Sequence, residues 1–274
     1  MSEININPIG MELAGKNVIY IGGYGGIGEK CVEAFLKKSV KSLLIFDLQS
    51  NDEYLGYLQN TYKKSFVDYI ALDLRKSESI KDAFQRAKQL IDNIDVVVNG
   101  SGVANENNID QLVQINLAGL MHSSLIAMDY MSKANGGHGG CIVNISSTTG
   151  LNPIDLCCVY GATKSGVIHF TNSLAKPIYF DKTGVSCITI CPGVTLTPIL
   201  KDVTTKCISG KYLPNLDSIL DSAVHQTPAV FAENLMKVIE TASNGSTWVL
   251  DDGKIDEVHL PQIWGPALRY KSQN

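Results

Sequence analysis

The sequence lacks the long apolar runs and the basic segments that mark membrane, secreted and nucleic-acid-binding proteins. No stretch approaches the roughly 18–20 apolar residues of a membrane-spanning helix. The N-terminal MSEININPIGMELAG has neither the basic region nor the apolar region of a secretory signal. Only three of the 23 basic residues are Arg, the Lys residues are scattered, and the net charge is −4. We therefore expect a cytoplasmic protein with no membrane span and no nucleic-acid partner.

Cysteine and histidine occur in no metal-binding pattern. The seven Cys are an odd number without a C-x-x-C pair, and the five His show neither H-x-x-x-H nor H-E-x-x-H spacing. We expect reduced, mostly buried thiols and no metal site. A G-x-S-x-G segment is also missing, which disfavours an α/β-hydrolase.

What the chain does have is a large apolar fraction in a regular alternation. Hydrophobic residues make up 45% of its 274 residues and charged residues 18%, enough for a sizeable core. Short β-branched runs alternate with segments of helical periodicity. The runs predict strands over 17–21, 42–46, 65–72, 94–100, 141–147, 185–192 and 247–252. The periodic segments predict helices over 27–38, 77–92, 110–133, 159–175 and 229–242.

Continuous apolar strands that alternate with helices are typical of a parallel sheet covered on both faces. Seven strands without a linker-like change in composition predict one doubly wound α/β domain over residues 1–274. We expect its core over about 15–252, a mobile insertion over 198–227 that covers the substrate, and a C-terminal tail over 253–274.

A glycine cluster, GGYGGIG at 22–28, lies between the first strand and the first helix. Glycine there allows a sharp turn and a close approach to a pyrophosphate, while the helix N-terminus supplies N–H groups. Methyltransferases and other nucleotide-binding proteins use similar loops, so the cluster alone leaves them open. It does not match a P-loop, because Glu29 separates Gly28 from Lys30.

Asp47 ends the second predicted strand, 19 residues beyond Gly28. A carboxylate there can accept both hydroxyls of an adenine ribose and repels a 2′-phosphate. No Arg or Lys follows at Leu48 or Gln49, and none lies in the glycine loop. The pattern favours NAD over NADP, although an Asp that only forms a turn is the alternative.

Tyr160 and Lys164 are four residues apart on a predicted helix and so share one face. About one such pair is expected by chance in a chain with 11 Tyr. Its placement is more informative, because Ser147 ends a predicted strand 13 residues upstream and strand ends face the ligand crevice. A Lys ammonium, together with the positive nicotinamide ring of the cofactor, lowers the pKa of a neighbouring phenol and makes it a usable base. A Ser hydroxyl can hold the substrate oxygen by a hydrogen bond.

With these residues in place, the chain resembles the short-chain dehydrogenase/reductase family from Gly15 to about Asp251. The glycine loop matches the family's T-G-x-x-x-G-x-G pattern at Gly22, Gly26 and Gly28, with Ile21 in the position of Thr. The segments 129–150 and 159–175 resemble the insect-type alcohol dehydrogenases, with their photoreceptor-dehydrogenase and fat-body relatives, and the 15-hydroxyprostaglandin dehydrogenases. Cys157 stands where the prostaglandin enzymes carry Gln, which disfavours a prostaglandin substrate.

The resemblance implies a Rossmann-type fold and assigns roles to single residues. Asn116, in VQINLAG, corresponds to the helix Asn that completes a catalytic tetrad with Ser147, Tyr160 and Lys164 and orders a proton-relay water. The implied cofactor-binding residues are Gly22, Gly25, Gly26, Ile27, Gly28, Asp47, Leu48, Asp73, Leu74, Asn99, Gly100, Tyr160, Lys164, Pro192, Gly193, Val194 and Thr197. An apolar wall for the substrate is expected from Leu151, Val194, Leu196, Ile199 and Leu200. Cys157 and Cys158 could touch the substrate or pack in the core.

We therefore expect an NAD-dependent oxidoreductase that interconverts an apolar, secondary alcohol and its carbonyl compound, with Tyr160 as acid and base. The family also implies a homodimer or homotetramer that pairs the helices near 110–133 and 159–175. Two other hypotheses stay open. One is an NAD-binding relative with little turnover that serves as a storage or sensor protein, and the other is a methyltransferase that shares only the glycine loop.

Overall fold

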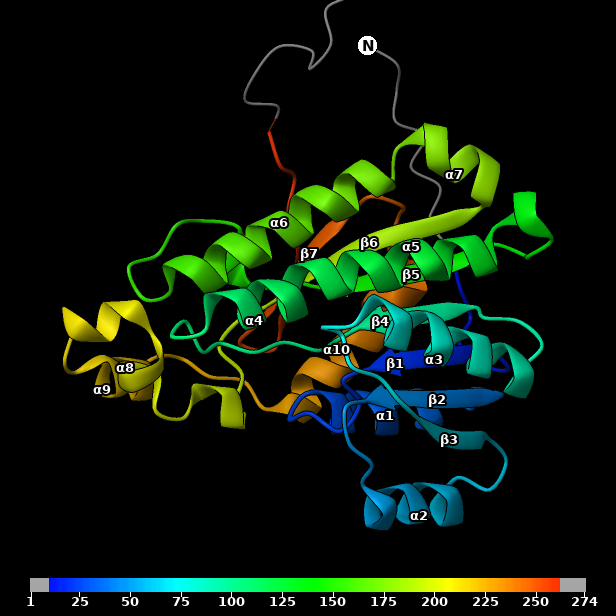
Figure 1. Cartoon of the computed structure of the whole chain (residues 1–274), viewed down its shortest axis with the longest axis horizontal. Helices are drawn as coiled ribbons and strands as arrows, with labels where there is room; N and C mark the ends of the chain where they lie inside the picture. The colour runs from blue at the N-terminus through cyan, green and yellow to red at the C-terminus, as the bar shows by residue number, and fades with distance from the viewer. Residues whose placement is uncertain (1–9, 262–274) are drawn as a thin grey trace, which may run out of the picture.

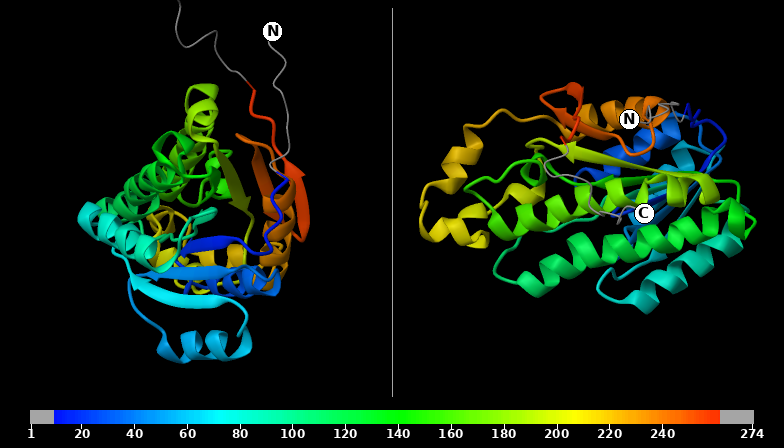
Figure 2. Two further views of the ribbon diagram at one scale, coloured as in Figure 1. Left: turned by 90° about the vertical axis from the view of Figure 1, so that its right-hand side faces the viewer. Right: turned by 90° about the horizontal axis from the view of Figure 1, so that it is seen from above.

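The computed structural model describes residues 10–261, where one sheet lies between two layers of helices (Figures 1 and 2). The strands are β1 (Asn17–Ile21), β2 (Ser42–Asp47), β3 (Phe66–Ala71), β4 (Val96–Asn99), β5 (Gly140–Ile145), β6 (Val185–Pro192), β7 (Thr247–Asp251) and β8 (Lys254–Glu257). The α-helices are α1 (Gly28–Lys37), α2 (Asp52–Thr61), α3 (Ser77–Leu90), α4 (Ile109–Val113), α5 (Leu120–Met131), α6 (Cys158–Leu174), α7 (Pro177–Thr183), α8 (Val203–Lys206), α9 (Leu216–Asp221) and α10 (Pro228–Thr241). This arrangement confirms the predicted doubly wound α/β fold.

The strands follow the order β3-β2-β1-β4-β5-β6-β7-β8, and the first seven are parallel. β1 lies between β2 and β4 in the sheet. Its Val18 is in register with Leu43 of β2 on one side and with Val96 of β4 on the other. The chain changes its direction of winding between β1 and β4. Ligands of open α/β sheets bind at the carboxyl ends of the strands at such a switch point.

Apolar side chains on both faces of the strands hold the helices in place. Side chains at alternate positions of one strand point to opposite faces, and β1 shows this with Val18 and Tyr20 on one face and Ile19 and Ile21 on the other. The first face packs against α1, α2 and α10, and the second against α3, α5 and the end of α6. Strands buried on both faces explain the unbroken apolar runs in the sequence.

The prediction of seven strands was one short. β8 pairs antiparallel with β7, and the two are joined by Asp252 and Gly253, both with positive φ (50° and 72°). A two-residue Asp-Gly loop of this kind is a strong hairpin signal that the sequence contained. β8 is an edge strand that pairs only with β7. Its sequence, KIDE, lacks the alternating apolar residues by which a strand could be predicted. The predicted tail therefore begins with a hairpin strand, and its residues 262–274 lie outside the described part of the chain.

The helix predicted over 110–133 is interrupted. α4 and α5 are joined by a π-helical turn at Gln114–Gly119, which contains Asn116. Gly119 ends this turn against the backbone of Leu74, whose carbonyl oxygen would be only 2.6 Å from a Cβ added at Gly119. Single π turns inside helices occur frequently at functional sites.

The insertion over 198–227 is not an unstructured loop. It contains α8, α9 and the 3₁₀ turns Pro198–Leu200 and Ile208–Lys211. It lies beyond the beginning of α6 in Figure 1 and in the right-hand view of Figure 2. The helices α2 and α7 were not predicted at all. Among residues 10–261 no helix is long and apolar enough to cross a membrane.

Candidate functional site

A cleft of about 1080 Å³ opens at the carboxyl ends of β1, β2, β4, β5 and β6. Most of the site residues expected from the sequence line it, including the glycine loop, Asp47, Asp73, Ser147, Tyr160, Lys164 and the segment from Pro192 to Thr197. Asn99 and Asn116 do not line it. The topology thus brings together in one space residues that are as much as 198 positions apart (Gly22 and Leu220).

The glycine loop leaves no room for side chains at its closest points. A Cβ added at Gly28 would lie 2.1 Å from the Gly22 carbonyl oxygen, and one at Gly26 would lie 2.9 Å from the Thr197 Cβ. Gly22 itself has φ +85°. No side chain caps the N-terminus of α1 at Ile27, and its first residue, Gly28, lines the cleft. A helix N-terminus favours an anion through its N–H groups and its dipole. This arrangement fits the pyrophosphate of a dinucleotide.

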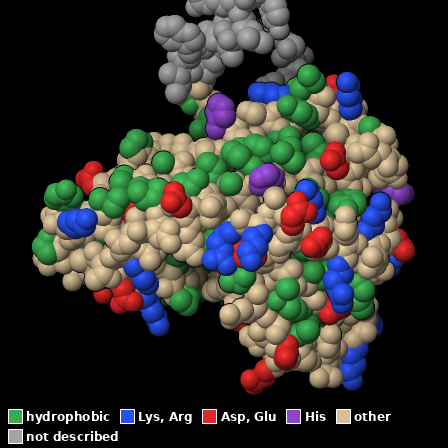
Figure 3. Space-filling view, viewed as in Figure 1, with side chains coloured by type: hydrophobic (Ala, Val, Ile, Leu, Met, Phe, Trp, Pro, Cys, Tyr) green, Lys and Arg blue, Asp and Glu red, His purple; other side chains and the backbone are tan. Residues whose placement is uncertain are grey.

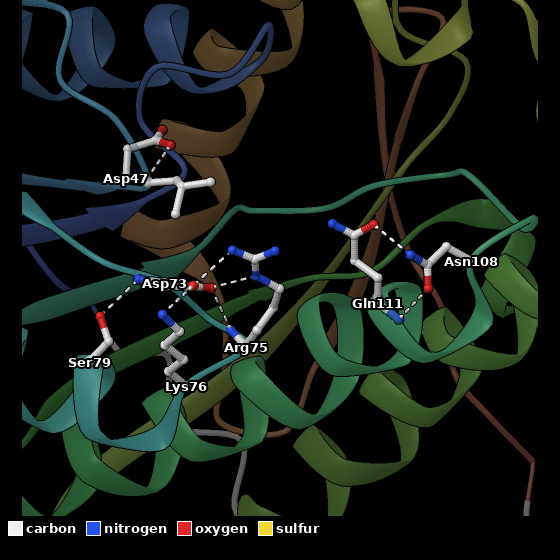
Figure 4. Close-up of polar contacts among 8 residues, drawn as sticks. Asp47, Asp73, Arg75, Lys76, Ser79, Asn108 and Gln111 are labelled. Carbon is white, nitrogen blue, oxygen red and sulfur yellow. Dashed lines mark hydrogen bonds and ion pairs between the residues drawn. The ribbon is translucent and has the colours of Figure 1, made fainter.

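Two carboxylates stand at one end of the cleft, where the adenine half of a dinucleotide is expected (Figure 4). Asp47 accepts hydrogen bonds from the backbone N–H groups of Tyr24 (3.0 Å) and Leu48 (2.8 Å). It therefore ties the glycine loop to the end of β2. We call this group of residues, with Asp73, Leu74 and the arginine described next, the adenine end.

Arg75 is a residue of the adenine end that the sequence reasoning missed. Its guanidinium turns back on Asp73 with two hydrogen bonds of 2.8 Å, as Figure 4 shows. This pairing holds the pKa of Asp73 below its usual range. The side chain of Asp73 is thus already engaged within the chain, and Asp73, Leu74 and Arg75 all line the cleft. The short spacing of Asp73-Leu74-Arg75 was a visible signal for this contact.

Ser147, Tyr160 and Lys164 meet in the middle of the cleft. Ser147 lies two residues beyond β5, and its Oγ accepts from the Thr149 N–H at 3.2 Å. Tyr160 and Lys164 come from the first two turns of α6, and the ammonium lies 5.6 Å from the centre of the phenol ring. The same ammonium donates to the Ile145 carbonyl at 3.0 Å, which fixes it beneath the ring.

Burial dominates the electrostatics of this group. It lowers the pKa of Lys164 to about 8, and it raises the pKa of Tyr160 well above its ordinary value, an effect that the hydrogen bond with Ser147 partly offsets. In the chain alone, therefore, burial outweighs the Lys164 ammonium, and the lower pKa of the phenol that the sequence predicts depends on the ammonium together with the positive nicotinamide ring. Further positive charge beside the phenol is needed to make it a base near neutral pH.

Asn116 supports the group from behind the cleft. Its amide both accepts from and donates to the backbone of Val103 (2.9 and 2.8 Å) and is fully buried. A Cβ added at Gly102 would lie 3.4 Å from Lys164 Nζ and 3.7 Å from Asn116 Oδ1. Both functional side chains therefore approach the same point beside Gly102, which is compatible with the relay role that the resemblance implies.

Asn99 is not at the cleft surface. Its side chain is buried in a hydrogen-bonded network with Asn144, Ser123 and Ser124, which joins β4, β5 and α5. Gly100 does line the cleft, and a Cβ there would lie 2.7 Å from the ring of Tyr20. A second Asn, which the family pattern has at this position, would therefore collide with β1.

The segment after β6 closes the other side of the cleft. Pro192, Gly193, Val194 and Thr197 all line it, and a Cβ at Gly193 would lie 1.7 Å from the Asp251 carboxylate. Gln226, which the sequence reasoning also missed, donates to Thr195 Oγ1 (3.2 Å) and to the Leu250 carbonyl (2.6 Å). It links this segment to the end of the insertion and to β7.

Apolar side chains line the end of the cleft next to the insertion, which we call the substrate end. Of the expected wall, Val194, Ile199 and Leu200 line the cleft, whereas Leu151 and Leu196 do not. Cys157 lines it and Cys158 does not, and burial raises the pKa of the Cys157 thiol to about 12, which keeps it neutral. The other apolar lining residues are Ile154, Leu156, Val203, Cys207 and Leu220.

Among residues 10–261, the remaining titratable groups form neither a disulfide nor a metal cluster. All seven Cys lie within the described residues and are free thiols, as expected. No group of three or more His, Cys, Asp or Glu within residues 10–261 is arranged to hold a metal ion.

Comparison with known proteins agrees with this geometry. Residues 16–207 match the family described as short chain dehydrogenase. The chain belongs to the short-chain dehydrogenase family. It is therefore an oxidoreductase that depends on a nicotinamide dinucleotide, NAD or NADP.

Proteins of insects are among its relatives, as the resemblance implied. Alcohol dehydrogenase 1 of Ceratitis capitata is 35% identical over 94% of this chain and 100% of its own length. Fat body protein 2 of Drosophila melanogaster is 31% identical over 91% of this chain and 97% of its own length. The crystal structure of levodione reductase superposes with a TM-score of 0.73 over 87% of this chain and 96% of that one. At 18% identity, that likeness shows the fold of this short-chain dehydrogenase and nothing further.

Proposed function

We propose that this dehydrogenase uses NAD to oxidise an apolar, secondary alcohol to its carbonyl compound, reversibly, with Tyr160 as the acid and base. The observation that carries the proposal is the meeting of Ser147, Tyr160 and Lys164 at the centre of a cleft that has the glycine loop on one side and apolar residues on another. The relatives named alcohol dehydrogenase support the class of substrate.

NAD is proposed over NADP because of Asp47. Its carboxylate stands at the adenine end and repels a 2′-phosphate, while it can accept from both ribose hydroxyls. Arg75 does not offset it, since the guanidinium is held by Asp73. The glycine loop would hold the pyrophosphate, and Lys164 the second ribose. The segment from Pro192 to Thr197 would hold the nicotinamide carboxamide.

The chain's own groups handle the proton of the reaction. Ser147 Oγ hydrogen-bonds the alcohol oxygen, and the Tyr160 phenolate takes the hydroxyl proton. The chemistry that NAD supplies when bound is the acceptance of the hydride that leaves the alcohol carbon. The positive charge of the Lys164 ammonium favours the phenolate. Asn116 orders the water that relays the proton away from the site. The apolar substrate end excludes water from the reacting carbon.

The proposal is tested by following NADH formation with NAD and a panel of secondary alcohols, sterols, retinoids and hydroxy-fatty acids. Turnover that the Tyr160→Phe protein lacks would support it. Binding of NAD without turnover of any alcohol would favour the storage or sensor function. The match of residues 16–207 to the short chain dehydrogenase family excludes the methyltransferase hypothesis. Undiminished turnover in Tyr160→Phe would refute the role of the phenol.

We also propose that the dehydrogenase forms a dimer or tetramer through the helices over 110–133 and 159–175. Hydrophobic side chains gather in a band along α5 and α6 in the space-filling view (Figure 3). Val113 of α4 and Leu125 of α5 are 36% and 47% exposed. Light scattering is expected to give a multiple of 29.7 kDa for the wild type and the monomer mass for Leu125→Glu. A wild-type monomer at micromolar concentration would contradict the proposal.

A further inference from the structure

Glu106 is a buried carboxylate that belongs to no sequence motif discussed above. It lies between β4 and α4 and is only 1% exposed, although Glu is almost never fully buried unless it is paired. None of the ion pairs within residues 10–261 includes it. Its charge is balanced by backbone N–H groups alone, and these come from two distant parts of the chain.

One carboxylate oxygen of Glu106 binds the beginning of the catalytic helix. Oε1 accepts from the N–H groups of Val159 (2.7 Å) and Tyr160 (2.9 Å). These are the second and third residues of α6, whose own N-cap residue, Cys157, makes no side-chain cap. The first N–H groups of a helix have no partner within the helix, and a negative charge there is favoured by the helix dipole. Glu106 thus fixes the backbone of the residue that carries the phenol.

The other carboxylate oxygen binds the insertion. Oε2 accepts from the Ile208 N–H at 2.9 Å. The backbone N–H of Glu106 donates to the Lys206 carbonyl at 2.9 Å, so that both its main chain and its side chain hold the same short segment. Lys206 and Cys207, next to Ile208, line the substrate end of the cleft. One side chain therefore connects the wall of the substrate end to the amide of Tyr160.

We propose that Glu106 is a positioning residue that couples the insertion to Tyr160, so that the packing of a substrate against the insertion aligns the phenol. The proposal rests on the proposed function of Tyr160 as acid and base. A misplacement of about 1 Å in a catalytic group can cost about a hundredfold in rate. Because Glu106 binds the backbone N–H group of Tyr160 directly, a loss of this hydrogen bond can displace the phenol by that amount.

Glu106→Gln tests the first half of the connection, because it keeps the size of the side chain but turns an NH₂ donor toward one of the N–H groups. We expect kcat to fall about tenfold to a hundredfold, with the KM for NAD unchanged. We also expect a larger primary isotope effect with an alcohol deuterated at the reacting carbon, since the chemical step then limits the rate. Glu106→Asp, which keeps the charge, should recover part of the loss.

Ile208→Pro tests the second half, because it removes only the N–H group of the insertion that Oε2 binds. Ile208 begins a 3₁₀ turn, and Cys207 before it has extended backbone (φ −95°, ψ 144°), so that proline fits there. Ile208→Val retains the N–H group and is the matched control. We expect Ile208→Pro to lower kcat in the same way as Glu106→Gln, and the double variant to lose less than the product of the two single losses.

Hydrogen exchange of the protein alone gives a readout that does not depend on turnover. In Glu106→Gln we expect faster exchange in both the beginning of α6 and the 203–211 segment, while the strands exchange as in the wild type. Absence of turnover in the wild type would refute the proposed function, and the exchange would still test the connection. If Glu106→Gln failed to fold, Ile208→Pro against Ile208→Val would decide alone.

Three results would overturn the proposal. The first is a wild-type kcat and isotope effect in folded Glu106→Gln, which would leave Glu106 with a structural role only. The second is a normal kcat in Ile208→Pro. The third is a strictly multiplicative loss in the double variant, which would mean that the two groups act independently.

Discussion

The adenine end and the substrate end of the cleft are held in place by different kinds of contact. At the adenine end, Asp47 ends β2 and Asp73 lies two residues beyond β3. Their partners are at most 23 residues away in sequence, from the adjacent Leu48 and the nearby Arg75 to Tyr24. At the substrate end, the apolar lining comes from short helices and turns of the insertion. These are joined to the sheet by contacts such as that of Glu106 with Ile208, 102 residues away. The adenine end is therefore rigid by local structure, whereas the substrate end depends on long-range hydrogen bonds.

Removal of the Tyr160 hydroxyl should have the largest effect and should leave both ends intact. Tyr160→Phe loses the group that takes the proton, and general acid–base catalysis contributes roughly 10²–10⁴-fold in rate. We expect kcat to fall by that factor, with little change in the dissociation constant of NAD measured by fluorescence titration. Tyr179→Phe, on the exposed surface of α7, is the matched control. Weaker NAD binding in step with kcat would mean that the phenol mainly holds the cofactor.

Asp47→Asn should affect the adenine end alone. The amide keeps the shape of the side chain and an acceptor for the glycine loop but loses the charge that binds ribose hydroxyls. A hydrogen bond to a charged group contributes about 1.5–3 kcal/mol, so we expect the KM for NAD to rise roughly tenfold to a hundredfold at nearly constant kcat. Use of NADP should improve relative to NAD. Asp52→Asn, nearby and exposed, should change neither value, and an unchanged ratio of NAD to NADP use in Asp47→Asn would contradict the proposed preference.

Lys164 stands between the two ends, and its burial predicts a dependence of stability on pH. Its pKa is lowered to about 8 in the folded chain, whereas an ordinary Lys in the unfolded chain titrates near 10.4. Between these values the unfolded chain binds more protons, so this group makes the free energy of unfolding increase with pH.

Relative to Lys164→Met, the wild type should gain about 2 kcal/mol between pH 8 and pH 9.5. Urea unfolding at several pH values measures the difference. Lys176→Met, at an exposed position, controls for the loss of a positive charge. A difference that is flat over this range would mean that the ammonium is not desolvated by the fold.

The same contrast explains which parts of the site could be predicted from the sequence. The glycine loop, Asp47, Tyr160 and Lys164 are recognisable because their spacing along a strand, turn and helix already fixes where they lie. Glu106 and Gln226 were missed because they bind backbone groups of remote segments, and no local periodicity marks such a residue. β8 was missed for a different reason, since its Asp252-Gly253 turn was visible but the strand itself is short and charged.

Leu200→Ala should have the smallest effect, confined to the substrate end. The leucine lines the cleft from the 3₁₀ turn Pro198–Leu200, and each buried methylene group contributes about 0.8 kcal/mol. We expect the KM for an apolar alcohol to rise about tenfold, with the KM for NAD unchanged and with less effect on small alcohols. Ile219→Ala, whose side chain is 45% exposed on α9 and does not line the cleft, is the matched control. Equal losses in the two variants would mean that the insertion acts through its stability and not through contact with the substrate.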